Sequence, residues 1–326
     1  MKHILGYDIG GTKVAVSLGD EEGRILASTR LPSGATRAYR DVFPEMVDAG
    51  KQVIEEAGFS IGDVDACGVC APGPLDVPNG RMLKSPNMQW DDVPIRDDLA
   101  DVFGKNVHFD NDANGGGLAE YYFGAGRGAE NLVYLTMSTG IGGGVINHGQ
   151  LLQGGGGNAG ELGHVILDVN GPRCGCGMNG CFEAFCGGRA VQERLQRMMR
   201  SEPCQALLDI PEVAGKIENL DYITLRKGVE AKIPEALEIW DEICLRIAQG
   251  IGIQIMTFDP DVVVLGTLAM YSGDLLLDPV RHYVPRFAWK KMLDHCQIKV
   301  TALGKSIGEL AGISVGLYGL RHVGRT

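Results

Sequence analysis

Two glycine-rich segments carry the residue types that bind phosphate. Residues 8–13, DIGGTK, place an acid at the end of an apolar run, before glycines whose bare amides approach a phosphate and a hydroxyl that donates to it. Residues 138–144, STGIGGG, offer amides and hydroxyls in the same way. Both segments also suit an ordinary hairpin, in which glycine only supplies a positive φ. Neither is a P-loop, and the ending Gly304-Lys305-Ser306 has Lys299 where that motif requires glycine.

One imidazole and three thiols lie within eighteen residues, a spacing typical of structural zinc. They are His164, Cys174, Cys176 and Cys181, and the glycines between the cysteines let the backbone fold tightly around an ion. Four protein ligands leave no open position for water, which disfavours a catalytic zinc. The alternative is a glycine-rich surface loop with reduced thiols. The other six cysteines lie mostly in apolar surroundings and are expected to be buried and reduced.

Polar residues also gather at predicted turns. Asn111 and Asp112 follow a predicted strand, Glu161 and His164 lie in the segment AGELGH, and Glu183 follows the last cysteine of the cluster. A carboxylate at a strand end can act as general base toward a hydroxyl, and amide, carboxylate and imidazole groups can recognise a polyol. Solvated turns and helix caps are the alternative for isolated acids.

The glycine turns require strands on both sides, and the pattern around them predicts a mixed α/β layer. Apolar residues at helical spacing predict a helix over 40–57. β-branched and apolar runs predict strands over 4–9, 13–18, 24–29, 65–69 and 106–109.

The same supersecondary pattern occurs a second time. A strand over 132–137, the second glycine turn and Val145-Ile146 parallel the first hairpin, which indicates two related halves facing one ligand. A long helix with an apolar stripe from Trp240 to Ile255 precedes a buried strand over 262–265. A helix over 307–320 is diluted by glycines, which permit close packing.

Length and charge limit the class of protein. The 326 residues allow two domains. The net charge of −11 disfavours nucleic acid and anionic membranes as partners. The N-terminal apolar stretch is too short for a signal peptide, and no run approaches the ~18 apolar residues of a membrane span. We therefore expect a cytoplasmic protein with no membrane or nucleic-acid partner.

Five motifs in order resemble the ROK family of sugar kinases and repressors, over essentially the whole chain. They are DIGGTK at 8–13, NDAN at 111–114, TGIGGG at 139–144, AGELGH at 159–164 and CGCGMNGCFE at 174–183. The resemblance implies an actin-like (hexokinase/ribonuclease H-like) ATPase fold, in which two α/β domains flank a cleft and close over a sugar and ATP. The small domain is expected at 1–118 plus 307–326, and the large domain, with the zinc-binding loop 164–181, at 119–306.

The family pattern also implies roles for single residues. Asp112 would be the general base for the primary hydroxyl, Asp8 would help to hold Mg²⁺, and His164 would serve both zinc and sugar. Thr267 stands in a late nucleotide-site turn where the family commonly has glycine, and is expected to reshape the adenosine pocket. The phosphates and nucleotide would contact Asp8, Gly10, Gly11, Thr12, Lys13, Thr139, Gly140 and Gly266. The sugar would contact Gly73, Asn87, Asn111, Asp112, Glu161, His164 and Glu183.

The expected activity is ATP-dependent phosphorylation of the 6-hydroxyl of a hexose, a step of carbohydrate metabolism such as glycolysis. Glucose is preferred, because Glu183 and His164 next to the reducing end of a pyranose suit it. N-acetylmannosamine and N-acetylglucosamine remain alternatives, since NGP before the cysteines and FEAF after them also occur in N-acetylmannosamine kinases. A sugar-sensing regulator of the same family is the non-enzyme alternative, although a repressor would need a helix-turn-helix before Asp8. The resemblance suggests a homodimer or homotetramer.

Overall fold

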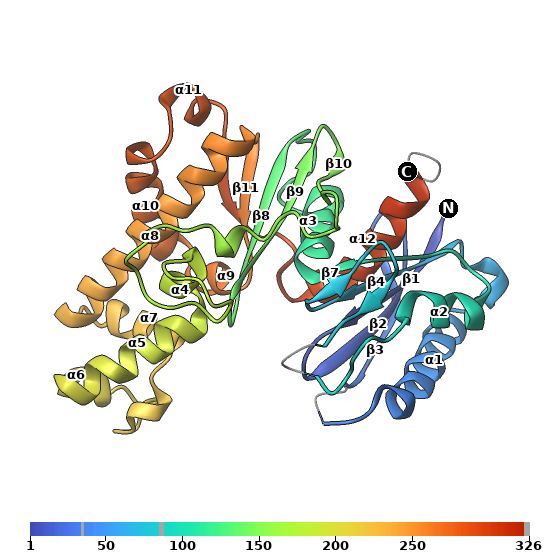
Figure 1. Cartoon of the computed structure of the whole chain (residues 1–326), viewed down its shortest axis with the longest axis horizontal. Coiled ribbons are helices and arrows are strands. Elements are labelled where there is room, and N and C mark those ends of the chain that lie inside the picture. Colours follow the sequence, from blue (N-terminus) through green and yellow to red (C-terminus); the bar gives the residue numbers. More distant parts are fainter. Residues whose placement is uncertain (34–35, 85–87, 323–326) are drawn as a thin grey trace. The chain divides into compact units, whose positions relative to one another are not determined.

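The computed structural model describes residues 1–33, 36–84 and 88–322 (Figure 1). The chain divides into two compact units, 1–134 with 144–160 and 302–326, and 135–143 with 161–301. The boundaries of these compact units differ from those of the predicted functional domains, because residues 119–134 and 144–160 belong to the first unit. The division into functional domains remains a prediction. None of the described helices is long and apolar enough to span a bilayer.

The first sheet has five strands in the order β3-β2-β1-β4-β7. Strands β3, β2 and β1 pair antiparallel, whereas β1, β4 and β7 pair parallel. The carboxyl ends of the three parallel strands therefore lie at one edge, where Asp8 and Asn111 stand. The strands confirm the predicted ones and are β1 His3–Ile9, β2 Lys13–Asp20, β3 Ile25–Pro32, β4 Ala66–Ala71 and β7 Val107–Asn111.

The second sheet repeats this order as β10-β9-β8-β11-β12, which confirms the predicted internal repeat. The predicted glycine turn over 138–144 is shorter than expected, because residues 141–144 belong to β9. A Cβ on Gly144 would lie 2.8 Å from the carbonyl oxygen of Ala113, so glycine lets this strand approach a helix. The strands are β8 Leu132–Met137, β9 Ile141–Asn147, β10 Gln150–Leu151, β11 Val262–Leu265 and β12 Gln297–Val300, and a separate ribbon pairs β5 Leu75–Asp76 with β6 Arg81–Met82.

The helices confirm the predicted apolar stripes. The stripe of α8 from Trp240 to Ile255 is buried, as are the apolar positions of α1. The helices are α1 Tyr39–Glu56, α2 Ile95–Phe103, α3 Asp112–Phe123, α4 Phe182–Cys186, α5 Gly188–Ser201, α6 Gln205–Leu208, α7 Tyr222–Glu230, α8 Pro234–Phe258, α9 Leu268–Ser272, α10 Asp274–Tyr283, α11 Lys290–Leu293 and α12 Ile307–His322.

Helices α1 and α12 cover opposite faces of the first sheet. The hydroxyl of Tyr7 donates to a carbonyl of α1, whereas Gly6 and Gly68 meet the backbone of α12. A Cβ on Gly68 would lie 2.0 Å from the carbonyl oxygen of Gly312, so the glycines that weaken α12 as a helix make its close packing possible. Side chains alternate along a strand, so Asp8 shares the α12 face with Gly6.

Candidate active site and metal centre

The predicted site residues divide between the two units, and each set is described by itself. In the first unit, Asp8 lies near two other acidic residues, Asp112 and Glu309. Burial and the charges of Asp112 and Glu309 raise the pKa of Asp8 to about 7, and the cations of Lys13 and Arg30 oppose the shift. The excess of carboxylates over cations at this strand end favours a bound cation.

The first glycine turn follows directly from β1. The amide of Gly10 donates to the carbonyl of Lys13 at 2.8 Å, and the carbonyl of Thr12 accepts from the amide of Ser33 at 3.1 Å. The side chains of Thr12 and Lys13 are exposed, so the closed turn leaves both free to meet a ligand. Gly73 is also exposed, on the segment between β4 and β5. Asn87 lies outside the described residues.

Asp112 occupies the first position of α3. Asn111 caps this helix, because its side-chain oxygen accepts from the amide of Asn114 at 2.6 Å. Asp112 is exposed, and it lies in the first turn of the helix, where acidic residues are commonly found. The carboxylate predicted to be the general base is thus held at the N-terminus of a capped helix and is exposed.

In the second unit, Glu183 on α4 is tied to the second glycine turn. Its Oε2 accepts from the amide of Ile141 at 2.8 Å, and its Oε1 lies 3.7 Å from Cys174 Sγ. A Cβ on Gly140 would lie 2.2 Å from Glu183 Oε2, which explains glycine at this position. The turn is further held by the amide of Arg189, which donates to the carbonyl of Thr139. The glycine turn and Glu183 therefore form one fixed arrangement.

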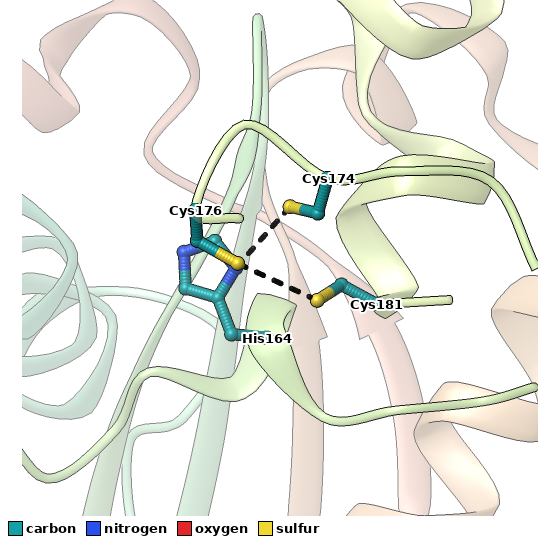
Figure 2. A group of neighbouring side chains, drawn as sticks. All are labelled: His164, Cys174, Cys176 and Cys181. Atoms are coloured by element: carbon teal, nitrogen blue, oxygen red, sulfur yellow. Dashed lines mark hydrogen bonds between the residues drawn. The ribbon is translucent and has the colours of Figure 1, made fainter. Parts of the chain in front are cut away.

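The four predicted zinc ligands come together in the second unit (Figure 2). Their ligand atoms all lie within 4.8 Å of one another. His164 Nδ1 is 3.7 Å from Cys174 Sγ, and Cys176 Sγ is 3.7 Å from Cys181 Sγ. Zinc bonds of about 2.3 Å to sulfur and about 2.0 Å to nitrogen, at tetrahedral angles, give separations of roughly 3.5 to 3.8 Å. The donor set and its spacing fit tetrahedral zinc.

The orientation of His164 links this cluster to Glu161. Its Nδ1 faces the cysteines, whereas its Nε2 lies 3.9 Å from Glu161 Oε2. The His164 amide donates to the Glu161 carbonyl at 3.0 Å, which fixes the turn between them. A Cβ on Gly163 would lie 1.9 Å from the carbonyl oxygen of Ile141, so this glycine seats the turn against β9. One ring nitrogen thus faces the cysteines and the other faces Glu161.

The turn after β11 carries a strained residue. The amide of Gly266 donates to the carbonyl of Leu135 at 2.8 Å. Thr267 has φ 51° and ψ −103°, a conformation that costs a residue with a Cβ about 1–3 kcal/mol. Its hydroxyl lies 3.2 Å from that of Thr136. The departure from glycine noted in the sequence therefore coincides with backbone strain.

Sequence reasoning missed two buried acids of the first unit. Glu309 pairs with Arg30, and its Oε2 finds no hydrogen-bond partner among the described residues. Asp110, at the end of β7, is 2% exposed and directly precedes the NDAN motif. An acid at the start of an apolar, glycine-rich helix was the available signal for Glu309, and the adjacency to Asn111 was the signal for Asp110.

Known proteins resemble this chain over its whole length. The model of the ROK family matches residues 4–314. The chain belongs to the ROK family. It is 33% identical over 315 residues to a glucokinase from Thermotoga maritima, covering 96% of both chains. It also resembles the ROK hexokinase of Thermus thermophilus (TM-score 0.84, 31% identity, 98% and 99% of the two chains).

A further similar structure is that of a ROK family glucokinase from Streptomyces griseus in complex with glucose and AMPPNP. Its TM-score is 0.77 at 30% identity, and the match covers 96% of this chain and 99% of that one. These likenesses confirm the predicted family and the predicted α/β, actin-like fold.

Proposed function

We propose that this ROK protein is an ATP-dependent hexose kinase that phosphorylates the 6-hydroxyl of glucose. The likeness to a glucokinase at 33% identity, over 96% of both chains, carries the proposal. The acid at the end of β1, the capped acid of α3 and the two glycine turns supply the residue types that phosphoryl transfer needs.

In the proposed mechanism, Asp112 accepts the proton of the 6-hydroxyl while that oxygen bonds to the γ-phosphorus of ATP. The bond between this phosphorus and the β–γ bridging oxygen breaks, and ADP leaves with the electron pair. Asp112 then returns its proton to solvent. Its place at an exposed helix N-terminus leaves the carboxylate accessible to a substrate.

Magnesium is proposed to bind at Asp8, where carboxylate oxygens are the ligands that this ion prefers. The buried Oε2 of Glu309 has no hydrogen-bond partner among the described residues, and the pKa of Asp8 is raised. Both observations indicate that the negative charge here is not neutralised by the protein's own cations. When bound, the ion would neutralise negative charge on the phosphates. The phosphates and nucleotide are proposed to contact Gly10, Gly11, Thr12, Lys13, Thr139, Gly140 and Gly266.

Zinc is proposed as a structural ion on His164, Cys174, Cys176 and Cys181. By holding Nδ1 it would fix the ring, and Nε2 would remain for a sugar hydroxyl beside Glu161. The sugar is proposed to contact Gly73, Asn87, Asn111, Asp112, Glu161, His164 and Glu183.

The test is ADP release by the purified protein with MgATP and one sugar at a time: glucose, mannose, fructose, allose, N-acetylglucosamine or N-acetylmannosamine. Selective turnover of glucose is expected. Turnover of only an N-acetylated sugar would keep the kinase and overturn the proposed substrate. Absence of turnover with every sugar, together with glucose binding by calorimetry, would favour a sugar-sensing regulator instead. Assembly into a homodimer or homotetramer remains a prediction, which light scattering can check. The cytoplasmic location also remains a prediction.

A further inference from the structure

Asp110 is a buried acid for which the proposed mechanism has no use. It stands at the carboxyl end of β7, two residues before Asp112, and is 2% exposed. Strand pairing places it opposite Cys70, which in turn pairs with Asp8, so the three side chains form a row across β7, β4 and β1. Gly115 of α3 lies over this row, because a Cβ there would stand 2.2 Å from Cys70 Sγ.

Three donors converge on the Asp110 carboxylate. Its Oδ1 accepts from the amide of Asn111 at 2.8 Å and from Asn114 Nδ2 at 2.7 Å. Its Oδ2 accepts from Gln153 Nε2 at 2.6 Å. Burial raises the pKa of Asp110, and these three hydrogen bonds oppose that shift. Both oxygens of the Asp110 carboxylate therefore accept hydrogen bonds.

The donors belong to two separate segments of the first unit. Asn111 and Asn114 flank Asp112 in the first turn of α3, and Gln153 begins the glycine-rich stretch that leads to Glu161. Asp110 and Gln153 also line a cavity of about 660 Å³, so no dense packing holds Gln153 on that side. Backbone hydrogen bonds from Leu152 to Val145 and from Ala159 to Gln153 hold this segment as well, and the bond to Asp110 ties it to the first turn of α3.

We propose that Asp110 is a positioning residue for the phosphoryl transfer. It locks the first turn of α3, and with it the direction of the Asp112 carboxylate, and it ties that turn to the segment that begins at Gln153. The inference rests on the proposed kinase function and on Asp112 as its base. A misplacement of about 1 Å at a reacting group costs roughly 10²-fold in rate, which sets the scale of the effect.

The experiment compares Asp110→Ala, Asp110→Asn and the control Asp20→Ala. Asp20 is also buried in the first unit and also accepts three hydrogen bonds, from the amides of Glu22 and Arg24 and from Arg24 Nε. It pairs with His3 at the opposite end of β1 from Asp8. The control thus removes an equal set of hydrogen bonds away from Asp112.

Steady-state kinetics with glucose and MgATP are measured well below each melting temperature. Asp110→Ala is expected to lower kcat about 30- to 100-fold with the KM for ATP unchanged. Asp110→Asn keeps Oδ1 for two donors, and Gln153 can turn its amide oxygen toward the new amide, so kcat is expected within about 3-fold of wild type. Asp20→Ala is expected to lower the melting temperature and leave kcat unchanged.

Hydrogen exchange of residues 111–118 gives a second readout that needs no activity. Faster exchange is expected in Asp110→Ala and not in Asp110→Asn. The proposal is overturned if Asp110→Ala keeps kcat within about 3-fold, or if Asp20→Ala loses as much kcat. If the wild type turns over no sugar, the proposed function fails, and unchanged exchange in Asp110→Ala would separately refute the locking of the helix.

Discussion

The raised pKa of Asp8 predicts that the protein without ligands loses stability as the pH rises. Burial and the neighbouring acids raise this pKa from 3.8 to about 7, so the folded chain binds the proton more tightly than the unfolded chain does. The protonated form therefore stabilises the fold. Its contribution is complete below about pH 4 and is lost as the pH rises to about 7.

The magnitude follows from the difference between the two pKa values. A difference of about three pH units corresponds to at most about 4 kcal/mol, of which about 3 kcal/mol is lost between pH 5 and pH 8. Urea unfolding of wild type and Asp8→Asn at several pH values measures it. The variant is expected to match the wild type near pH 4 and to be the more stable protein at pH 8.

The control is Asp48→Asn, which changes an exposed acid on α1 and should keep the wild-type pH dependence. Equal pH dependence of unfolding in wild type and Asp8→Asn would refute the reasoning, because the stabilising proton would then lie elsewhere.

Three further predictions concern the second unit. Cys176→Ala removes one of the four proposed zinc ligands and should lower zinc affinity about 100-fold, measured by competition with a chelator and metal analysis; an unchanged zinc affinity would contradict the site. Gly140→Ala places a Cβ 2.2 Å from Glu183 Oε2 and should raise the KM for glucose about 10-fold, whereas Gly175→Ala, with open space around it, should not. Thr267→Gly relieves a backbone conformation that costs about 1–3 kcal/mol, and the added glycine entropy costs about 0.5–1 kcal/mol. Urea unfolding should therefore show that the variant is at least as stable as the wild type. A clear loss of stability would mean that the hydroxyl contact with Thr136 outweighs the strain.

Much of the fold could be predicted because most of its strands are short runs of apolar and β-branched residues. The helix stripe from Trp240 to Ile255 follows from periodicity, and the strand over 262–265 follows from a short apolar run after Asp259-Pro260. The extent of β9 could not be predicted, because glycine usually interrupts a strand. The strand begins at Ile141, and the close approach of Gly144 to α3 gives a structural reason for the glycine at that position.

The site was predictable where one motif holds its residues together. The cluster of His164 with three cysteines forms from a short segment, so spacing was enough to find it. The surroundings of Asp8 could not be predicted, because Glu309 lies 301 positions away along the chain and comes near Asp8 only through the packing of α12. Asp110 was missed for a similar reason, since its partner Gln153 comes from a separate loop.

The most direct test of the proposed function is glucose-dependent ADP release by wild type and by Asp112→Asn, with glucose affinity measured in parallel by calorimetry. We predict that the variant binds glucose about as well as the wild type and turns over at least ~10²-fold more slowly, because general-base catalysis contributes about 10²–10⁴-fold. Comparable turnover in the two proteins would contradict the assignment of Asp112 as the base.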